Sequence, residues 1–300
     1  MISFRYRLKY DSPEELKRVL TEQCEKINLL CLADEQDLHT RIHDIRKSFK
    51  RIRAVLKFIR KKVNEDDYKW LNREFRNAAK AYSDIRDHEV FVKTWQKLMT
   101  PSSLQKDRKL MENIAGYLIR IRDASTQQSI HEGQLFSDTM HTLQSIEPPV
   151  ISLDIQENNL VNWLPGLQEM YGEGKSWLEQ VRQDPEDKLN EHEWRKKVVN
   201  LKYQTYMLYE IWPYQFRMAG NVLDRLSESL GSAHDLFQLE SFIYGEEQLS
   251  SQVKDSFVMR RIISRRKQLI KQGINLAEHF YLEEPEIFHK RMAGYLKLKS

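Results

Sequence analysis

The stretch HTRIHDIRKSFKRIRAVLKFIRKK, residues 39–62, contains ten Lys or Arg, two His and one acid, Asp44. On a helical wheel with about 100° per residue, its apolar residues gather on one side. They are Ile42, Ile45, Phe49, Ile52, Leu56 and Ile59. The opposite side carries His43, Arg46, Lys47, Lys50, Lys57 and Lys61. The stretch predicts an amphipathic helix with a cationic stripe. Because adjacent like charges repel by about 0.2–0.5 kcal/mol per pair, we expect acids on other helices or a bound polyanion to compensate.

A second copy of this stretch begins 149 residues later. HDIRKSFKRIRAVL at 43–56 aligns with HEWRKKVVNLKYQT at 192–205. The matched pairs are His43 with His192, Asp44 with Glu193, Arg46 with Arg195, Lys47 with Lys196, Ile52 with Leu201 and Arg53 with Lys202. Downstream, SDIRDHEVF at 83–91 aligns with GSAHDLFQL at 231–239 and places Asp87 opposite Asp235. The chain therefore contains a duplicated helical unit, whose two basic helices are expected to face each other across a cleft that focuses positive potential.

The composition favours an all-α fold. The 300 residues include only ten Gly and eight Pro, hydrophobic residues make up 40%, and strand patterns are almost absent. The segment DSPEELKRVLTEQCEKINLL begins with a cap-like Ser12 and with Pro13 at the first helical position. Further helices are predicted at about 35–63, 66–81, 85–99, 103–122, 160–182, 188–211, 217–230, 233–244 and 250–281.

A polar stretch separates the two halves. DASTQQSIHEGQLFSD and IEPPVISLD interrupt the helical periodicity, so residues 123–158 are predicted to be a linker. The Pro148-Pro149 pair is expected to end any helix there. The first helical half then covers about 12–122 and the second about 159–298.

Charge and cysteine content exclude some classes of protein. The net charge of +4 is mildly basic, so the positive density of 39–62 must be offset elsewhere in the chain. The two cysteines, Cys24 and Cys31, and the charged start MISFRYRLKY favour a reducing, cytoplasmic compartment. No run approaches the roughly 18 apolar residues that cross a bilayer, so no membrane association is expected.

The ordered motifs resemble the conserved-histidine α-helical domain, CHAD. The family pattern H-x-x-R-K-x-x-K-x-x-R is met by His43, Arg46, Lys47, Lys50 and Arg53. SDIRDHEVF resembles the arginine-aspartate turn of the family. Later stretches resemble family segments in the expected order, namely YGEGKSWL, HEWRKK, LKYQ, Trp212-Pro213, LGSAHDL, RRIISRRKQL and EEPEIFHKRM. The resemblance extends from about residue 12 to 298 and departs at Val199 and Asn200, where a Lys or Arg is common.

The resemblance implies one compact all-α domain over 12–298, built from two pseudo-symmetric antiparallel four-helix bundles around a central basic groove or pore. It also implies binding of inorganic polyphosphate without catalysis or a cofactor, and an association with polyphosphate granules. Lys and forked Arg donors along a groove suit such a chain of phosphates. The expected binding residues are His43, Arg46, Lys47, Lys50, Arg53, Lys57, His192, Arg195, Lys196, Lys202, Arg260, Arg265, Arg266 and Lys267.

Several of these residues also have a structural interpretation. His43 and His192 suit either phosphate hydrogen bonding or a bond between helices. Arg86 beside Asp87 is expected to tie helices together, and Trp194 and Tyr203 are expected to pack in the core. The carboxy-terminal cluster is divided around its helical wheel, because Arg260, Lys267 and Lys271 share one side while Arg265 and Arg266 point elsewhere.

Two other functions fit parts of the sequence. Non-specific binding of nucleic-acid backbones is the first alternative, although stacking of bases requires exposed aromatics among the basic residues, and Phe49 lies on the apolar side. An HD-type metal phosphohydrolase is the second, suggested by the His43-Asp44 and His234-Asp235 doublets. A divalent ion needs several converging ligands, and the field of the ten-base helix around Asp44 would oppose it.

Overall fold

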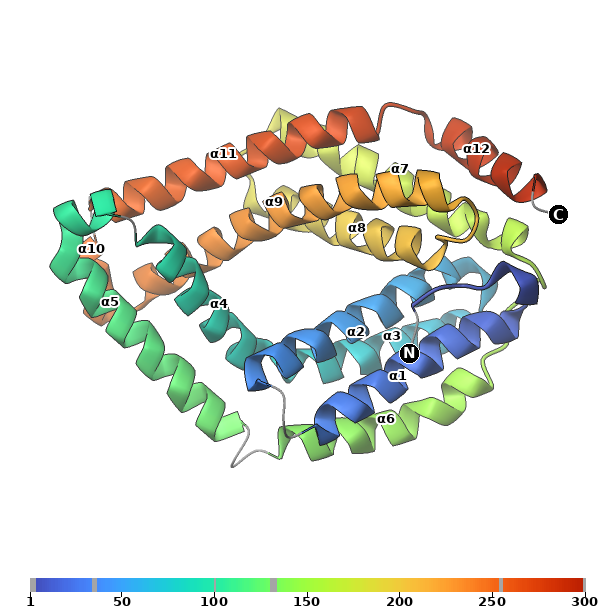
Figure 1. The fold of residues 1–300 in the computed structure, drawn as a ribbon, viewed down its shortest axis with the longest axis horizontal. Helices are drawn as coiled ribbons and strands as arrows, with labels where there is room; N and C mark the ends of the chain where they lie inside the picture. Colours follow the sequence, from blue (N-terminus) through green and yellow to red (C-terminus); the bar gives the residue numbers. More distant parts are fainter. Residues whose placement is uncertain (1–3, 34–36, 100, 130–133, 254–255, 299–300) are drawn as a thin grey trace.

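The computed structural model describes residues 4–33, 37–99, 101–129, 134–253 and 256–298 (Figure 1). All regular structure in these ranges is helical, as the sequence predicts. The helices are α1 (Pro13–Leu32), α2 (Leu38–Phe58), α3 (Glu65–Lys80), α4 (Ser83–Leu98), α5 (Pro101–Gln127), α6 (Leu135–Ile151), α7 (Leu160–Gln183), α8 (Lys188–Met207), α9 (Pro213–Gly245), α10 (Glu247–Val253), α11 (Phe257–Phe280) and α12 (Pro285–Lys297). Short 3-10 turns lie at Leu8–Tyr10 and Arg60–Lys62.

The helix that carries the cationic stripe forms as its sequence predicts. Asp37 caps α2 by accepting a hydrogen bond from the Thr40 amide. All six apolar residues of the predicted buried face are at most 1% exposed. Burial of this face fixes the rotation of α2 and directs the basic residues away from the core.

The contacts between helices repeat in the two halves. In the first half, α1 packs against α2 and α6, and α2 packs against α3. In the second half, α7 packs against α8 and α12, and α8 packs against α9. The two basic helices, α2 and α8, pack against each other where the halves meet (Figure 1). Helices α4 and α5 cross between the halves and pack against α9 and α11, so the division into two separate four-helix bundles stays a prediction.

The prediction of a linker at residues 123–158 is wrong for most of its length. Helix α5 continues to Gln127, and α6 occupies 135–151, where it packs against α1 and α3. Its apolar residues Leu143, Ile146 and Val150 are at most 1% exposed, and their burial stabilises a segment whose polar composition suggested a loop. Residues 130–133 of the predicted linker lie outside the described residues.

The Pro148-Pro149 pair does not end its helix. Both prolines lie within α6, which continues to Ile151. A proline in the last turn removes only bonds near the helix end, and the Ser152 amide and hydroxyl both donate to the Pro148 carbonyl at 3.0 Å.

Two helix boundaries in the second half also differ from the sequence prediction. The segments predicted at 217–230 and 233–244 form one helix, α9, because packing against α8 and α11 supports it through Gly231. The segment predicted at 250–281 is divided into α10 and α11. Cys24 and Cys31 are buried and free. Among the described residues, no helix is long and apolar enough to span a membrane.

Candidate functional site

A basic cavity of about 680 Å³ lies between the two halves and is lined by α2, α4, α8 and α9. Its charged and imidazole residues are Arg46, Lys47, Lys50, Arg86, Lys188, Arg195, Lys202, His43, His192, His234, Asp87 and Asp235. Seven Lys or Arg therefore face only two carboxylates. This excess gives the cavity a positive electrostatic potential.

The α2 side of the cavity holds cations without ion pairs. The Arg46 guanidinium donates to the Ala79 carbonyl at 3.2 Å and to the Ser83 hydroxyl at 3.0 Å, which fix its position without neutralising it. Within the described residues, Lys47 and Lys50 form neither a hydrogen bond nor an ion pair. Their charges remain available to a ligand.

The α8 side is partly neutralised. Lys202 donates to the Ser227 hydroxyl at 2.8 Å and lies 3.6 Å from an Asp224 carboxylate oxygen. Lys188 lies 3.9 Å from Glu186. Arg195, by contrast, forms no ion pair in the described part of the chain, and its buried Nε has no hydrogen-bond partner. Arg195 is therefore the strongest uncompensated charge on this side.

Gly231 lies beside Arg195. A Cβ atom at this position of α9 would lie 3.9 Å from the guanidinium Nε and Nη2 atoms. In the first copy of the repeat, Ser83 corresponds to Gly231, and its hydroxyl accepts a hydrogen bond from Arg46. The two repeated arginines, Arg46 and Arg195, thus each lie beside a small residue at matching positions of the repeat.

Desolvation and neighbouring cations lower the pKa of the central lysine. Lys50 is exposed to the open cavity but surrounded by protein on its other sides. Desolvation, together with the cations Arg195 and Arg46, lowers the pKa of Lys50 to about 7. An anion in the cavity would reverse this effect, because it favours the charged ammonium.

The histidines of the cavity are neutral at pH 7. Desolvation lowers the pKa of both His43 and His192, with Arg86 and Lys196 as the next causes, respectively. Desolvation and Arg195 lower the pKa of His234 to about 3. The rings of His192 and His234 lie 5.2 Å apart. These imidazoles therefore offer hydrogen bonds rather than charge.

The cavity brings together half of the residues that the sequence proposes as ligands. They are His43, Arg46, Lys47, Lys50, His192, Arg195 and Lys202. Arg53 lines a smaller hollow of about 210 Å³ together with Arg46 and Lys50, and donates to Asn72 at 3.1 Å. Lys57 lines neither space, and burial lowers its pKa to about 8. Lys196 is exposed and pairs with Glu193.

The carboxy-terminal basic cluster does not line the cavity. Arg266 is 3% exposed and forms a buried ion pair with Glu191 at 2.8 Å. Lys267 pairs with Glu186 at 3.1 Å. Arg265 and Arg260 are exposed on α11, and Arg265 donates to Gln268. The acids that compensate this cluster come from the start of α8 and the loop before it, which the sequence spacing does not show.

The cavity also includes residues that the sequence did not propose as ligands. Arg86 and Asp87 line it and form no ion pair within the described part of the chain, so the expectation that the adjacent acid supplies the partner of Arg86 is wrong. His234 and Asp235 also line it, and the repeat that aligns Asp87 with Asp235 is the signal that locates both. Trp194 and Tyr203 are both buried in the core, as expected, and Tyr203, which is 6% exposed, also lines the cavity.

The imidazoles and carboxylates of the cavity do not form a metal site. No group of three or more His, Cys, Asp or Glu side chains within the described residues is arranged to hold a metal ion. Asp87 and Asp235 are instead surrounded by the cavity's arginines, and desolvation raises the pKa of both carboxyls.

Comparisons with known proteins agree with the fold. The structure resembles a crystal structure of the CHAD domain from the plant Ricinus communis, with a TM-score of 0.53, 15% identity, and coverage of 93% of this chain and 96% of that chain. It also resembles PptA from Streptomyces chartreusis, with a TM-score of 0.58, 12% identity, and coverage of 91% and 100%. No curated protein sequence matches the chain. The CHAD domain model matches residues 20–243, most of the chain, and this protein belongs to the CHAD domain family.

Proposed function

We propose that the basic cavity binds inorganic polyphosphate and catalyses no reaction on it. The observation that carries the proposal is a group of five cations that line the cavity and form no ion pair with any described residue. They are Arg46, Lys47, Lys50, Arg86 and Arg195. Keeping such charges together is costly unless an anion compensates them. Membership in a family in which some members bind polyphosphate supports the same ligand.

The chemistry of the lining suits a chain of phosphates. Arginine donates two parallel hydrogen bonds to phosphate oxygens, and lysine supplies a compact charge. The neutral imidazoles of His43 and His192 add hydrogen bonds at opposite sides of the cavity. Arg46 and Lys50 also line the adjoining hollow with Arg53, Arg76 and Lys80, so the positive surface continues beyond the main cavity. A ligand longer than a single phosphate group uses both spaces.

Nucleic acids fit this surface less well. Binding of single strands relies on aromatic faces on which bases stack. The aromatic residues of the cavity, Phe91, Tyr203 and Phe237, are buried or half-buried. In competition with labelled long-chain polyphosphate at equal phosphate concentration, RNA and duplex DNA are therefore expected to displace little of the label. Equal displacement would favour the nucleic-acid alternative.

A triple variant tests the site itself. Arg46→Ala, Lys47→Ala and Lys50→Ala together remove three cations while the buried face of α2 remains intact. Affinity for long-chain polyphosphate is expected to fall at least a hundredfold. The slope of log affinity against log salt should decrease by about two, because each phosphate contact on a single strand contributes about 0.7. Isothermal titration calorimetry at several salt concentrations measures both quantities.

The chain offers a matched control for this loss of charge. Arg265→Ala, Lys267→Ala and Lys271→Ala remove three exposed cations from α11, outside the cavity. This control should bind polyphosphate within about threefold of the wild type. Equal losses in the two triple variants would mean that net charge, rather than the cavity, determines binding. Association with polyphosphate granules in the cell is part of the proposal, and fluorescence microscopy of the tagged wild type and both variants tests it.

A further inference from the structure

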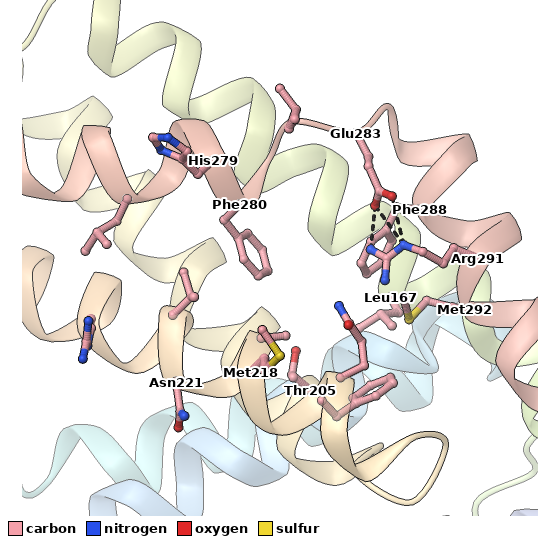
Figure 2. A pocket seen from close by; sticks show the side chains of 17 residues that line it. Leu167, Thr205, Met218, Asn221, His279, Phe280, Glu283, Phe288, Arg291 and Met292 are labelled. Carbon is pink, nitrogen blue, oxygen red and sulfur yellow. Dashed lines mark hydrogen bonds and ion pairs between the residues drawn. The ribbon is translucent and has the colours of Figure 1, made fainter.

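A second cavity lies at the outer end of the second half and shares no lining residue with the basic one. Its volume is about 580 Å³, and α7, α8, α9, α11 and α12 contribute to its wall. Figure 2 shows Phe280 directed into it toward Met218, with Leu167 and Met292 nearby. Met218 is 67% exposed and Leu282 is 80% exposed at its edge. The cavity is therefore largely apolar and open to solvent.

The internal repeat shows why the cavity is open. The buried residues of α3, Tyr68, Leu71 and Phe75, correspond with an offset of 148 to Phe216, Ala219 and Leu223 of α9. The same offset relates Asp87 to Asp235. Leu71 is 1% exposed, and α3 packs against α6. In the second half, alanine stands at the equivalent position, Ala219 lines the cavity, and α9 makes no extensive contact with α12 within the described residues.

The polar groups of the cavity leave one positive charge unpaired. At one end, Arg291 donates to both carboxylate oxygens of Glu283, at 2.9 and 2.6 Å, so this pair is neutral (Figure 2). His279 lies at the other end (Figure 2). Arg225 also lines the cavity, is exposed, and forms no hydrogen bond or ion pair among the described residues. A ligand with one negative charge would complement Arg225.

We propose that this cavity binds a small amphipathic molecule with an apolar body and one anionic head group, represented by a fatty carboxylate. The apolar body lies between Phe216, Phe280 and Met292, and the carboxylate pairs with Arg225 at the edge. The volume falls within the range of about 300–1,000 Å³ that is usual for sites of small molecules. The site is independent of polyphosphate binding.

Titration of the full-length protein with octanoate, decanoate and dodecanoate below their micelle-forming concentrations tests the proposal. Binding should saturate at one molecule per chain. Affinity should rise about fourfold for each added methylene, because burial of each contributes a similar transfer free energy. Dodecanol, which lacks the charge, should bind at least tenfold more weakly than dodecanoate. Absence of saturable binding, or equal affinity for dodecanol, would overturn the proposal.

Two variants and a control locate the site. Ala219→Phe fills the cavity and should weaken dodecanoate binding at least tenfold. Arg225→Gln, an exposed substitution that leaves the core intact, should weaken dodecanoate binding about tenfold without affecting dodecanol. Arg217→Gln removes a neighbouring cation of α9 that lies outside the cavity and should change neither affinity. Unchanged dodecanoate affinity in both Ala219→Phe and Arg225→Gln would contradict the assignment.

Two further readouts separate this site from its alternatives. Polyphosphate affinity should be the same in the wild type and in all three variants, whether or not the basic cavity performs its proposed function. Analytical ultracentrifugation should show the same oligomeric state for wild type and Ala219→Phe. A wild-type dimer that Ala219→Phe dissociates would show that a second copy of the chain occupies the cavity, and would overturn the proposal of a small ligand.

Discussion

Lys50 connects polyphosphate binding to pH at the scale of a single residue. In the empty cavity its pKa is lowered to about 7, while a bound polyanion would keep it protonated. Between pH 7 and 9, affinity for long-chain polyphosphate should therefore fall by up to about tenfold per pH unit, because binding takes up a proton. Calorimetry in two buffers with different ionisation enthalpies measures this uptake directly.

The matched variant for this prediction is Lys50→Arg. The guanidinium remains charged over the whole range, so the variant should bind with little dependence on pH. A pH dependence as steep as that of the wild type would show that another group, and not Lys50, takes up the proton. The pKa values of His43 and His192 are lowered from their usual range, so these residues contribute little above pH 7.

Lys50 should also lower the free energy of unfolding of the protein when no polyphosphate is bound. Between pH 7 and about 10 the unfolded chain holds a proton on Lys50 that the folded chain has lost, so the free energy of unfolding should rise with pH in this window. Lys50→Met should raise the free energy of unfolding at pH 6 by up to about 1 kcal/mol, after allowance for solvent screening. Urea denaturation without polyphosphate measures it, and a variant less stable than the wild type would contradict the cost of desolvation and repulsion that lowers the pKa of Lys50.

At the scale of elements, α2 and α8 contribute unequally to the cavity. Of the two residues that depart from the family pattern, Val199 lines the cavity. Asn200 is 9% exposed and donates to the Lys196 carbonyl at 2.7 Å. Only Val199 therefore weakens the positive lining of α8, while Asn200 has a structural role.

Val199→Lys should strengthen this side. Position 199 already faces the cavity, so the added ammonium would join its lining. The variant is expected to bind polyphosphate about threefold to tenfold more tightly at low salt, and its slope against log salt should increase by about 0.7. Gln268→Lys adds the same charge to an exposed position of α11 and serves as the control. Equal gains in the two variants would point to net charge as the cause.

The elements also show what the sequence can predict. The periodicity of 39–62 and its copy at 192–205 locate α2 and α8 and seven residues of the cavity, because a buried apolar face fixes the rotation of a helix. The α11 cluster could not be assigned, since its partners Glu186 and Glu191 are distant in sequence. Helix α6 was missed because its packing against α1 and α3 outweighs its polar residues and two prolines.

At the scale of the molecule, duplication and divergence explain both cavities. The basic cavity lies where the two copies meet, so α2 and α8 contribute residues to one site. The apolar cavity lies within the second copy alone, where Ala219 replaces the buried leucine of the first. A duplicated fold thus provides one shared site and one that belongs to a single half.

A crystal structure of the protein with a long-chain polyphosphate tests the central claim most directly. We expect a chain of phosphates in the 680 Å³ cavity, with oxygens within hydrogen-bond distance of Lys50 and Arg195, and continuing toward Arg53. Polyphosphate bound instead along the exposed cations of α11, with the cavity between α2 and α8 empty, would contradict it.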